Sequence, residues 1–455
     1  MLEELRAVLG SALVTDAAVL EALRTDKSGV RSTAAPLAVV EARDIADVQA
    51  ALRWASAHGI PVVPRGAGTG LAGGAIADAG ELVISTLRMN RVLEISVDDE
   101  LAVVEPGVLN GDFDAMLRPH GLWYAPDPAS RAISTIGGNI ATNAGGLMCV
   151  KYGVTREAVI GLKVVLADGR LLELGRRTVK GVTGYDLTAL FIGSEGTLGV
   201  IVEATLRLRP LVRGEVVTIS AAFPDVEQAA GASAAVSASG VRPAVMELLD
   251  ASALEAIGAH LGIDLGRRGA QLLVRTDGAA AVAEAEAIAA TIRAAGGTVE
   301  VSTDAAAGER LFGIRRAFHP AMERRGAVLI EDVAVPRSAL PAMFAAIARI
   351  ERSHGISIPT VAHAGDGNLH PNFVVELDPA DEFDVPDAVW AAADELFQEC
   401  LRLGGTLTGE HGVGLLKRRW LRQELGDDSF ELQRDLKRVF DPAGILNPGK
   451  VFSAN

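Results

Sequence analysis

The chain has 455 residues and a formal net charge of −15, and Cys149 and Cys400 are its only cysteines. This length is too great for one core, so two or three domains are expected. An acidic balance without a basic run argues against nucleic acid or an anionic membrane as the main partner, and two cysteines exclude a disulfide framework and a thiolate zinc site.

The first 212 residues mix helix and strand patterns with glycine-rich segments. In chain order, the expected elements are a helix over 43–58, strands over Glu81–Thr86 and Val92–Val104, a short helix within Gly107–Gly121, a glycine- and asparagine-rich stretch over 126–153, and strand, turn, strand, loop, strand over 157–208. The turn Ala167-Asp-Gly169 between two apolar runs predicts a β-hairpin.

The composition changes near Pro210, which predicts a second domain. Strands are expected over Val216–Ser220, Gln271–Thr276 and Thr298–Ser302, and alanine-rich helices over 225–239, 279–295 and 339–353. A polar helix over 427–439 follows later. The whole pattern predicts an α+β protein with boundaries at 1–212, 213–408 and 409–455.

Glycines are concentrated in three loops. The segment Gly68-Thr-Gly-Leu-Ala-Gly73 matches the dinucleotide fingerprint G-x-G-x-x-G, but no helix pattern follows it, so a Rossmann domain is not predicted. Bare amides can still form phosphate-binding nests. Two further loops, Ser134–Gly146 and Gly193–Gly199, add Ser, Thr and Asn side chains that suit a flavin ring, a ribose or a diphosphate. The alternative is a set of tightly turned surface loops.

The segment His363-Ala-Gly-Asp-Gly-Asn-Leu-His370 contains a turn sequence that can fold both imidazoles toward one place. With Glu410 and His411, these side chains can make an open site for zinc, manganese or iron with a base beside it. Histidines in ordinary structural roles are the alternative. In an extended segment, His370 and Asn372 face the same side, and Pro371 predicts an edge strand or a first strand residue.

The three loops carry a family resemblance. With Pro126-Asp-Pro128 ahead of the second and Gly184-Tyr-Asp-Leu187 ahead of the third, they resemble the FAD domain of the vanillyl-alcohol oxidase family, also named for p-cresol methylhydroxylase (PCMH). The resemblance covers nearly the whole chain. It is greatest to FAD-linked D-2-hydroxyacid dehydrogenases, namely D-lactate dehydrogenase, the flavin subunit of glycolate oxidase, and D-2-hydroxyglutarate dehydrogenase.

This resemblance implies a fold for each part of the chain. Residues 1–212 would form a PCMH-type FAD-binding domain of two α+β subdomains, and residues 213–408 an α+β substrate-binding or cap domain with a largely antiparallel sheet. Residues 409–455 would carry the active-site Glu-His pair and return to the FAD domain.

The resemblance also implies noncovalent FAD, because Thr69 stands where many members carry a flavin-linked histidine. The implied diphosphate residues are Arg65, Gly66, Ala67, Gly68, Thr69 and Gly73. The implied flavin-lining residues are Ser134, Thr135, Gly138, Asn139, Thr142 and Gly146, with Glu195, Gly196 and Ile201 from the third loop. Asn447 is a further implied cofactor residue, and Asn447 and Lys450 would bring the C-terminal segment back onto the FAD domain.

For the reaction, the resemblance implies that His363, His370 and Glu410 bind a divalent metal, most simply zinc. A 2-hydroxyacid can chelate such a cation, which favours loss of the hydroxyl proton. The implied base is His411, and the C2 hydride would pass to the flavin. Arg315 would bind the substrate carboxylate, with Arg316 as its neighbour and competitor, and Asn372 would contact the substrate.

The identity of the acid is less determined. Ile330 stands where 2-hydroxyglutarate enzymes have a lysine for the distal carboxylate, and His319 where they have a threonine. An apolar Ile330 would leave a second carboxylate unpaired, which favours a small monocarboxylate such as D-lactate or glycolate. A D-2-hydroxyglutarate dehydrogenase is the alternative, with His319 or Arg324 serving a longer acid.

Two other classes are alternatives: the flavin subunit of a multi-subunit glycolate oxidase, and a metal-dependent hydrolase. Acidic residues after Met1 and the lack of a long apolar run argue against a signal peptide and a membrane span. We therefore expect a cytoplasmic protein, or one that lies at a membrane only through its electron acceptor. That acceptor stays unidentified, and a homodimer is one option for assembly.

Overall fold

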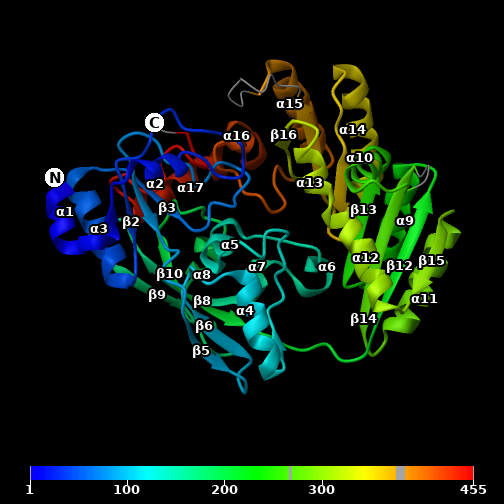
Figure 1. The fold of residues 1–455 in the computed structure, drawn as a ribbon, viewed down its shortest axis with the longest axis horizontal. Coiled ribbons are helices and arrows are strands. Elements are labelled where there is room, and N and C mark those ends of the chain that lie inside the picture. Colours follow the sequence, from blue (N-terminus) through cyan, green and yellow to red (C-terminus); the bar gives the residue numbers. More distant parts are fainter. Residues whose placement is uncertain (1, 266–268, 376–384, 454–455) are drawn as a thin grey trace. The chain divides into compact units, whose positions relative to one another are not determined.

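The computed structural model describes residues 2–265, 269–375 and 385–453. The chain divides into two compact units, drawn in Figure 1. The first unit comprises Met1–Gly145, Gly153–Leu211 and Glu410–Asn455, and the second comprises Gly146–Tyr152 and Val212–Gly409. The chain therefore passes between the units four times, and a short segment after the second glycine-rich loop belongs with the second unit. Both units mix helices and strands, which confirms the predicted α+β class.

The first unit contains a small, mostly parallel sheet in the order β1-β2-β4-β3. Its strands are β1 Leu13–Val14, β2 Ala38–Glu41, β3 Val62–Arg65 and β4 Leu82–Ser85, with β1 antiparallel to β2. The predicted helix is confirmed as α3 Ile45–His58, which begins where Asp44 accepts a hydrogen bond from the Asp47 N–H and ends at Gly59 with φ of 63°. Its buried face packs on this sheet.

A second sheet of the first unit is antiparallel and has the order β5-β6-β10-β8-β9. Its strands are β5 Val92–Ser96, β6 Leu101–Val104, β10 Val200–Arg207, β8 Val159–Val165 and β9 Leu171–Gly175. The prediction of one strand over Val92–Val104 is wrong, because the chain reverses at Asp98-Asp-Glu100, where Glu100 has φ of 50°. The predicted hairpin is confirmed by the pairing of Val165 with Leu171.

The remaining elements of this unit are mostly short, and α17 with 14 residues is the exception. They are α1 Leu2–Leu9, α2 Ala17–Ala22, α4 Asn110–Leu117, β7 Leu122–Trp123, α5 Ile136–Thr142, α7 Thr155–Ala158, α8 Leu187–Phe191, β11 Arg209–Pro210, α16 Arg418–Leu425 and α17 Asp427–Phe440. Within the glycine-rich stretch 126–153, α5 forms because Thr135 accepts a hydrogen bond from the Gly138 N–H, and it ends at Asn143 with φ of 52°. Glycine density alone did not indicate this helix.

The second unit is built on one antiparallel sheet in the order β15-β12-β14-β13-β18-β19-β16, with β17 also paired to β19. Its strands are β12 Glu215–Phe223, β13 Val245–Asp250, β14 Ala270–Gly278, β15 Thr298–Ser302, β16 Ala327–Ile330, β17 Val333–Ala334, β18 Thr360–His363 and β19 Asn368–Val375. The three strands predicted here are confirmed as β12, β14 and β15. The largely antiparallel sheet is confirmed as well.

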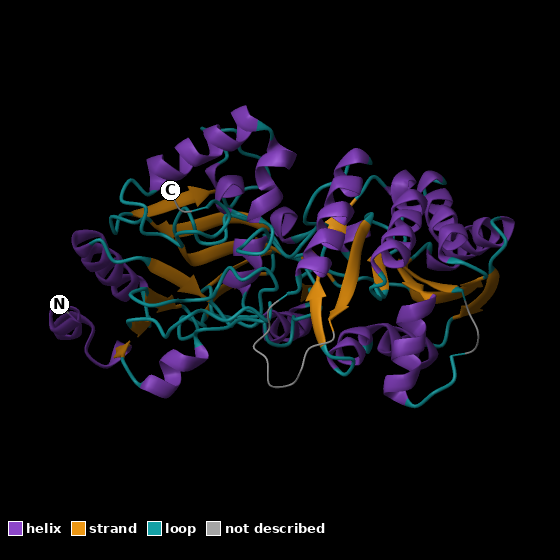
Figure 2. Cartoon of the chain, turned by 90° about the horizontal axis from the view of Figure 1, so that it is seen from above, coloured by secondary structure: helices purple, strands orange, loops and turns teal. Residues whose placement is uncertain are grey.

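Helices lie above and below the strands of this sheet in Figure 2. They are α9 Val226–Ala238, α10 Ala251–Leu261, α11 Ala281–Ala294, α12 Ala305–Arg316, α13 Phe318–Glu323, α14 Leu340–His354 and α15 Asp387–Arg402; the short α6 Cys149–Tyr152 also belongs to this unit. The alanine-rich patterns predicted α9, α11 and α14. The helices α10, α12 and α13 were not predicted.

The C-terminal segment returns to the first sheet, as expected. Leu446 forms a parallel bridge with Val62 of β3, and the Asn447 N–H donates to the Val62 carbonyl at 2.7 Å. The buried Asp441 carboxylate holds the backbone just before this bridge, because it accepts hydrogen bonds from the Ile445 and Leu446 N–H groups at 3.1 and 2.7 Å. Lys437 pairs with Asp441 and also donates to the Leu446 carbonyl at 2.8 Å. Burial lowers the pKa of Lys437.

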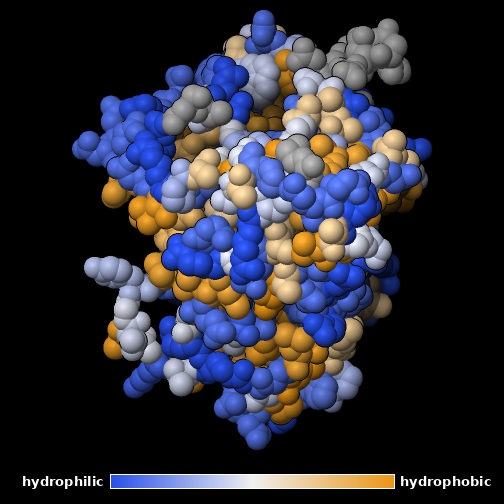
Figure 3. All heavy atoms as spheres, turned by 90° about the vertical axis from the view of Figure 1, so that its left-hand side faces the viewer, coloured by the Kyte–Doolittle hydropathy of each residue, from blue (hydrophilic) through white to orange (hydrophobic). Residues whose placement is uncertain are grey.

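Hydrophilic side chains cover much of the face shown in Figure 3, and apolar side chains are interspersed among them. Exposed apolar residues that are distributed in this way are normal on a protein surface. They do not by themselves indicate a partner.

Replacing Asp441 with alanine is expected to destabilise the first unit by about 3 kcal/mol or more, because Lys437 would keep a buried charge without its partner. Chemical denaturation of the purified protein measures this. Removing both charges with K437M/D441A should recover part of the loss. The matched control is Asp435→Ala on the same helix, whose ion pair with Arg438 is more than half exposed. Equal stability of D441A and D435A would contradict the assigned role of Asp441.

Candidate active site

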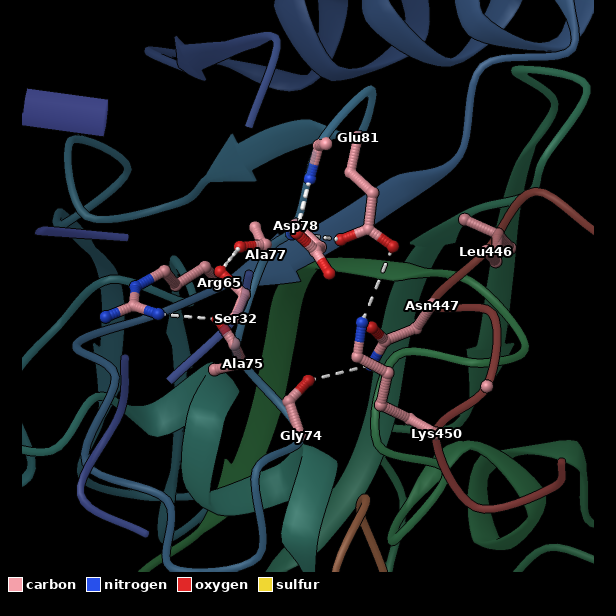
Figure 4. A network of polar contacts seen from close by, with 12 residues as sticks. Ser32, Arg65, Gly74, Ala75, Ala77, Asp78, Glu81, Leu446, Asn447 and Lys450 are labelled. Carbon is pink, nitrogen blue, oxygen red and sulfur yellow. Dashed lines mark hydrogen bonds and ion pairs between the residues drawn. The ribbon is translucent and has the colours of Figure 1, made fainter. Parts of the chain in front are cut away.

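The first glycine-rich loop leaves the carboxyl end of β3 at Arg65. The Arg65 guanidinium donates to the Ala75 carbonyl at 2.5 Å (Figure 4) and to the Thr25 carbonyl at 2.9 Å. Gly68 has φ of 67°, and a Cβ there would lie 2.3 Å from Arg65 Nη2. Arg65 therefore holds the loop in shape from within, and only glycine fits against its side chain.

The three loops and the C-terminal segment converge on one place in the first unit. A Cβ on Gly66 would lie 2.5 Å from Thr135 Oγ1, so the first two loops are in direct contact. The third loop lies on α5, where the Glu195 N–H donates to the Ala141 carbonyl at 2.8 Å. Asn447 Nδ2 donates to the Gly74 carbonyl at 2.9 Å (Figure 4) and to the Glu195 carbonyl at 2.8 Å, so the C-terminal segment is hydrogen-bonded to the first and third loops.

Three buried polar atoms at this place have no hydrogen-bond partner within the described residues. They are Ser134 Oγ, Asn139 Nδ2 and Asn447 Oδ1. Burying such groups without a partner costs free energy, so an orphaned cluster indicates a missing polar ligand. All three belong to the residues predicted to bind FAD. The donors and acceptors present therefore fit a flavin nucleotide.

The other predicted cofactor residues are distributed around the same loops. Ala67, Thr69 and Gly73 lie in the first loop, and Gly138 and Thr142 lie on α5, where the Thr142 hydroxyl donates to the Gly138 carbonyl at 3.3 Å. Gly196 lies in the third loop, and Ile201 is a buried residue of β10. Gly146 belongs to the second unit.

Glu195 of the third loop also binds the backbone of the C-terminal segment. Its carboxylate accepts hydrogen bonds from the N–H groups of Val413 at 2.7 Å and Gly414 at 2.9 Å. Burial raises the pKa of Glu195 to about 7. A Cβ on Gly412 would lie 2.9 Å from the Glu195 carboxyl carbon. Glu195 thus orders the chain directly after His411, whose Nε2 is 3.9 Å from Glu410 Oε1.

In the second unit, the predicted turn between the two histidines is confirmed. β18 ends at His363 and β19 begins at Asn368, with His363 paired to Asn368 and Val361 to His370. The two imidazole centroids are 5.0 Å apart at an interplanar angle of 83°. Gly367 has φ of 84°, and a Cβ there would lie 2.1 Å from the Val335 carbonyl oxygen. The turn therefore requires its glycine and brings both rings together.

A carboxylate that the sequence analysis missed joins this turn to the predicted substrate arginine. Glu247, in β13, is fully buried. Its Oε1 lies 2.6 Å from His363 Nδ1, and its Oε2 lies 2.8 Å from Arg315 Nε. The Arg315 side chain is 12% exposed, whereas that of Arg316 is 52% exposed and pairs with Glu309. Arg315 is therefore the arginine held beside the histidine turn.

Asp332 is a second buried carboxylate at this turn. It accepts hydrogen bonds from Asn368 Nδ2 at 2.6 Å, from the Thr408 hydroxyl at 2.6 Å and from the Gly409 N–H at 2.9 Å. Its Oδ1 is 3.8 Å from His370 Nδ1. The chain directly before Glu410 is thus held by the same side chain that faces His370.

The expectation that Pro371 marks an edge strand or a first strand residue is wrong. Pro371 lies inside β19, which pairs with β18 on one side and with β16 and β17 on the other. The Pro371 carbonyl accepts from the Glu331 N–H at 3.0 Å. At Glu331-Asp332 the partner strand is interrupted between β16 and β17, so the ladder has a gap where proline lacks a donor.

The remaining predicted substrate residues differ in placement. Asn372 is buried, and its Nδ2 donates to the His370 carbonyl at 2.8 Å. Ile330 is paired directly with Asn372, so the two side chains lie on the same face of the sheet. His319 is 49% exposed, and its Nε2 lies 3.3 Å from Glu323 Oε1 on the same helix, α13.

Comparisons with known proteins agree with these two units. Residues 214–451 match the family model described as "FAD linked oxidases, C-terminal domain", and residues 36–175 match "FAD binding domain". The chain belongs to the FAD linked oxidases. It is 41% identical over 426 residues to the glycolate oxidase subunit GlcD of Bacillus subtilis, which covers 92% of this chain and 89% of the relative.

Two further relatives of this FAD-linked oxidase carry other names. A D-2-hydroxyglutarate dehydrogenase of Xanthomonas citri is 38% identical, covering 93% of this chain and 91% of the relative. A D-lactate dehydrogenase of Archaeoglobus fulgidus is 36% identical, covering 91% and 90%. The protein is therefore an FAD-linked oxidoreductase of the type represented by these three relatives.

The solved structure of p-cresol methylhydroxylase with substrate bound matches with a TM-score of 0.81 at 18% identity, over 99% of this chain and 96% of that one. At this identity the match shows the fold, which is the PCMH-type FAD-binding fold. Among the described residues, no helix of this FAD-linked oxidase combines the length and apolarity that a bilayer span requires.

The raised pKa of Glu195 predicts a pH dependence of stability. Between 4.5, the ordinary value, and about 7, the folded protein keeps a proton that the unfolded chain has lost. This contribution to stability is therefore complete below 4.5 and is lost as the pH rises through about 7. We expect Glu195→Gln to gain thermal stability relative to the natural FAD-bound protein between pH 5 and pH 8.

The control for this measurement is Glu173→Gln, since the Glu173 side chain is 72% exposed. Its difference from the natural protein should stay constant over the same pH range. A constant difference for E195Q as well would show that Glu195 does not titrate in this range.

Proposed function

We propose that the protein oxidises a small 2-hydroxy monocarboxylate, of the D-lactate or glycolate kind, to the 2-oxoacid. The observation that carries this proposal is the Glu247 carboxylate, which joins Arg315 to His363. A cation that suits a carboxylate and an imidazole that suits a metal are thereby held next to each other. A 2-hydroxyacid offers the matching pair, one carboxylate and one hydroxyl on adjacent carbons. The names of the relatives support the same substrate class.

The metal ligands in this proposal are His363, His370 and Glu410. Because Glu247 occupies His363 Nδ1, a metal would bind His363 through Nε2, and a carboxylate behind a ligating imidazole is a common second layer of metal sites. Gly409 is held by Asp332 beside His370, and Glu410 is the next residue in the chain. Two imidazoles and one carboxylate suit zinc, and also manganese or iron.

When bound, the cation would polarise the substrate hydroxyl, and noncovalent FAD, held by the predicted cofactor residues, would accept the hydride. Side chains of the protein bind the substrate and accept its proton. Arg315 binds the substrate carboxylate through its Nη groups, since Glu247 takes its Nε. His411 accepts the hydroxyl proton. Asn372 contacts the substrate from β19, with its amide oriented by the His370 carbonyl.

The choice of a monocarboxylate rests on Ile330. Its side chain lies on the same face of the sheet as that of Asn372, directly across from it. A distal carboxylate that reached this point would meet an alkyl group instead of a cation, and an unpaired anion there is costly. His319 is half exposed and already faces Glu323, so it is a weaker candidate for a second carboxylate.

Two alternatives have specific support. The 38% identity to a D-2-hydroxyglutarate dehydrogenase favours a longer acid. The 41% identity to a protein named as a subunit favours a multi-subunit glycolate oxidase. The family of FAD linked oxidases, to which the chain belongs, argues against a metal-dependent hydrolase. The electron acceptor, the homodimer and the cytoplasmic location stay predictions.

The test of the proposed function is anaerobic mixing of the FAD-bound protein with single acids. D-lactate or glycolate should bleach the flavin absorbance, and L-lactate and D-2-hydroxyglutarate should bleach it more slowly. Bleaching by none of the four acids would contradict the proposed function. Bleaching by D-2-hydroxyglutarate alone would refute the argument from Ile330.

Replacing His411 with asparagine should slow flavin reduction by about 10²- to 10⁴-fold, because a general base contributes that much. Stopped-flow absorbance with saturating substrate measures the rate, and elemental analysis checks that the metal is retained. The matched control is His354→Asn, a histidine that pairs with Glu395 on the α14–α15 helices. Undiminished reduction by metal-replete H411N would rule out this role for His411.

A further inference from the structure

The Gly146–Tyr152 segment is inserted between two stretches of the first unit, yet it belongs to the second. It is fixed there by Asp277, near the end of β14. The Tyr152 hydroxyl donates to Asp277 Oδ2 at 2.6 Å, and Lys151 Nζ donates to Asp277 Oδ1 and, at 3.0 Å, to the Asp277 carbonyl. One carboxylate therefore holds two consecutive side chains of the segment.

This contact is stronger than an ordinary surface ion pair. The Asp277 side chain is 6% exposed and that of Lys151 is 25% exposed. Charge-assisted hydrogen bonds shielded from water are roughly twice as strong as neutral ones. The helix in the segment, α6, has four residues, which is too short to be stable by itself. The conformation of the segment consequently depends on Asp277 and on the packing of its apolar side chains.

The same segment packs on the histidine turn. Gly365 lies between His363 and His370, and a Cβ on it would lie 2.6 Å from Val150 Cγ2 and 2.8 Å from Val150 Cβ. The Gly365 N–H donates to the Met246 carbonyl at 3.2 Å, so the turn is held between β13 and the segment. Leu147, Met148 and Tyr152 pack on the core that contains Val361 of β18. The segment thus contacts the turn directly and the strand before it.

We propose that the Gly146–Tyr152 segment is a positioning element for the substrate side of the active site. Asp277 fixes Lys151 and Tyr152, which press Val150 against Gly365 and hold the His363–His370 turn in the geometry its ligands need. The inference rests on the proposed function, because it assumes that His363 and His370 of this turn bind the metal.

The test compares K151M/Y152F with the natural FAD-bound protein. Hydrogen–deuterium exchange of peptides covering 361–370 should become at least about 10-fold faster, because the turn loses its support. Flavin content should stay the same. The limiting rate of flavin reduction should fall by about 10-fold or more, since small displacements of reacting groups have effects of that size. The matched control is K163M, which removes a lysine that pairs with Glu203 in the first unit.

A second pair of variants tests the contact itself without removing a charge. Gly365→Ala should reproduce the faster exchange and slower reduction, because its Cβ displaces Val150. The swap V150G/G365A should restore both, because it returns the lost space. A merely structural role for Asp277 would not predict this rescue.

Each outcome decides the proposal. Unchanged exchange of 361–370 in K151M/Y152F overturns the positioning role, and so does faster exchange with an unchanged reduction rate. The exchange measurement needs no substrate. If the natural protein is not reduced by any 2-hydroxyacid, the proposed function fails while the contact between the segment and the turn is still tested.

Discussion

The active-site architecture depends on one constraint, which is that a buried carboxylate must be satisfied by donors on every side. Glu195, Glu247 and Asp332 are each buried, and each is satisfied by groups from other parts of the chain. Leaving such a group without partners would cost several kcal/mol. Moving a segment that supplies a donor would therefore lower the stability of the whole unit, and this fixes the position of the segment. Loops that look flexible in sequence become well defined.

The two units use this constraint in different ways. In the first, glycines let the loops approach closely, and the polar atoms left unsatisfied define where a cofactor is expected. In the second, the Glu247 carboxylate lies 2.6 Å from His363 Nδ1, and Asp332 Oδ1 lies 3.8 Å from His370 Nδ1, so a carboxylate stands behind each imidazole. One unit is thus incomplete without a ligand that supplies hydrogen bonds. The other presents side chains that are oriented before any ligand arrives.

The sequence predicted the features that depend on neighbouring residues. The His363–His370 turn follows from the four turn-forming residues Gly365-Asp-Gly-Asn368, and the α3 helix follows from its apolar spacing and its Gly59 end. Features that depend on distant partners were missed. Glu247 is 116 residues from His363 and 68 from Arg315, so nothing near it in the sequence indicates its role. Pro371 misled for the same reason, because the gap in its partner strand is a property of the assembled sheet.

The pairing of Leu446 with Val62 has a consequence for synthesis of the protein on the ribosome. Asn447 hydrogen-bonds to Gly74, which is 373 residues earlier. The bridge to Val62 of β3 can therefore form only after Leu446 has been synthesised. Residues 212–409 of the second unit are synthesised before that point. Domains usually complete in the order in which they emerge. Here the unit that begins first is completed last, because Leu446 is synthesised long after the four strands of the sheet to which it bridges.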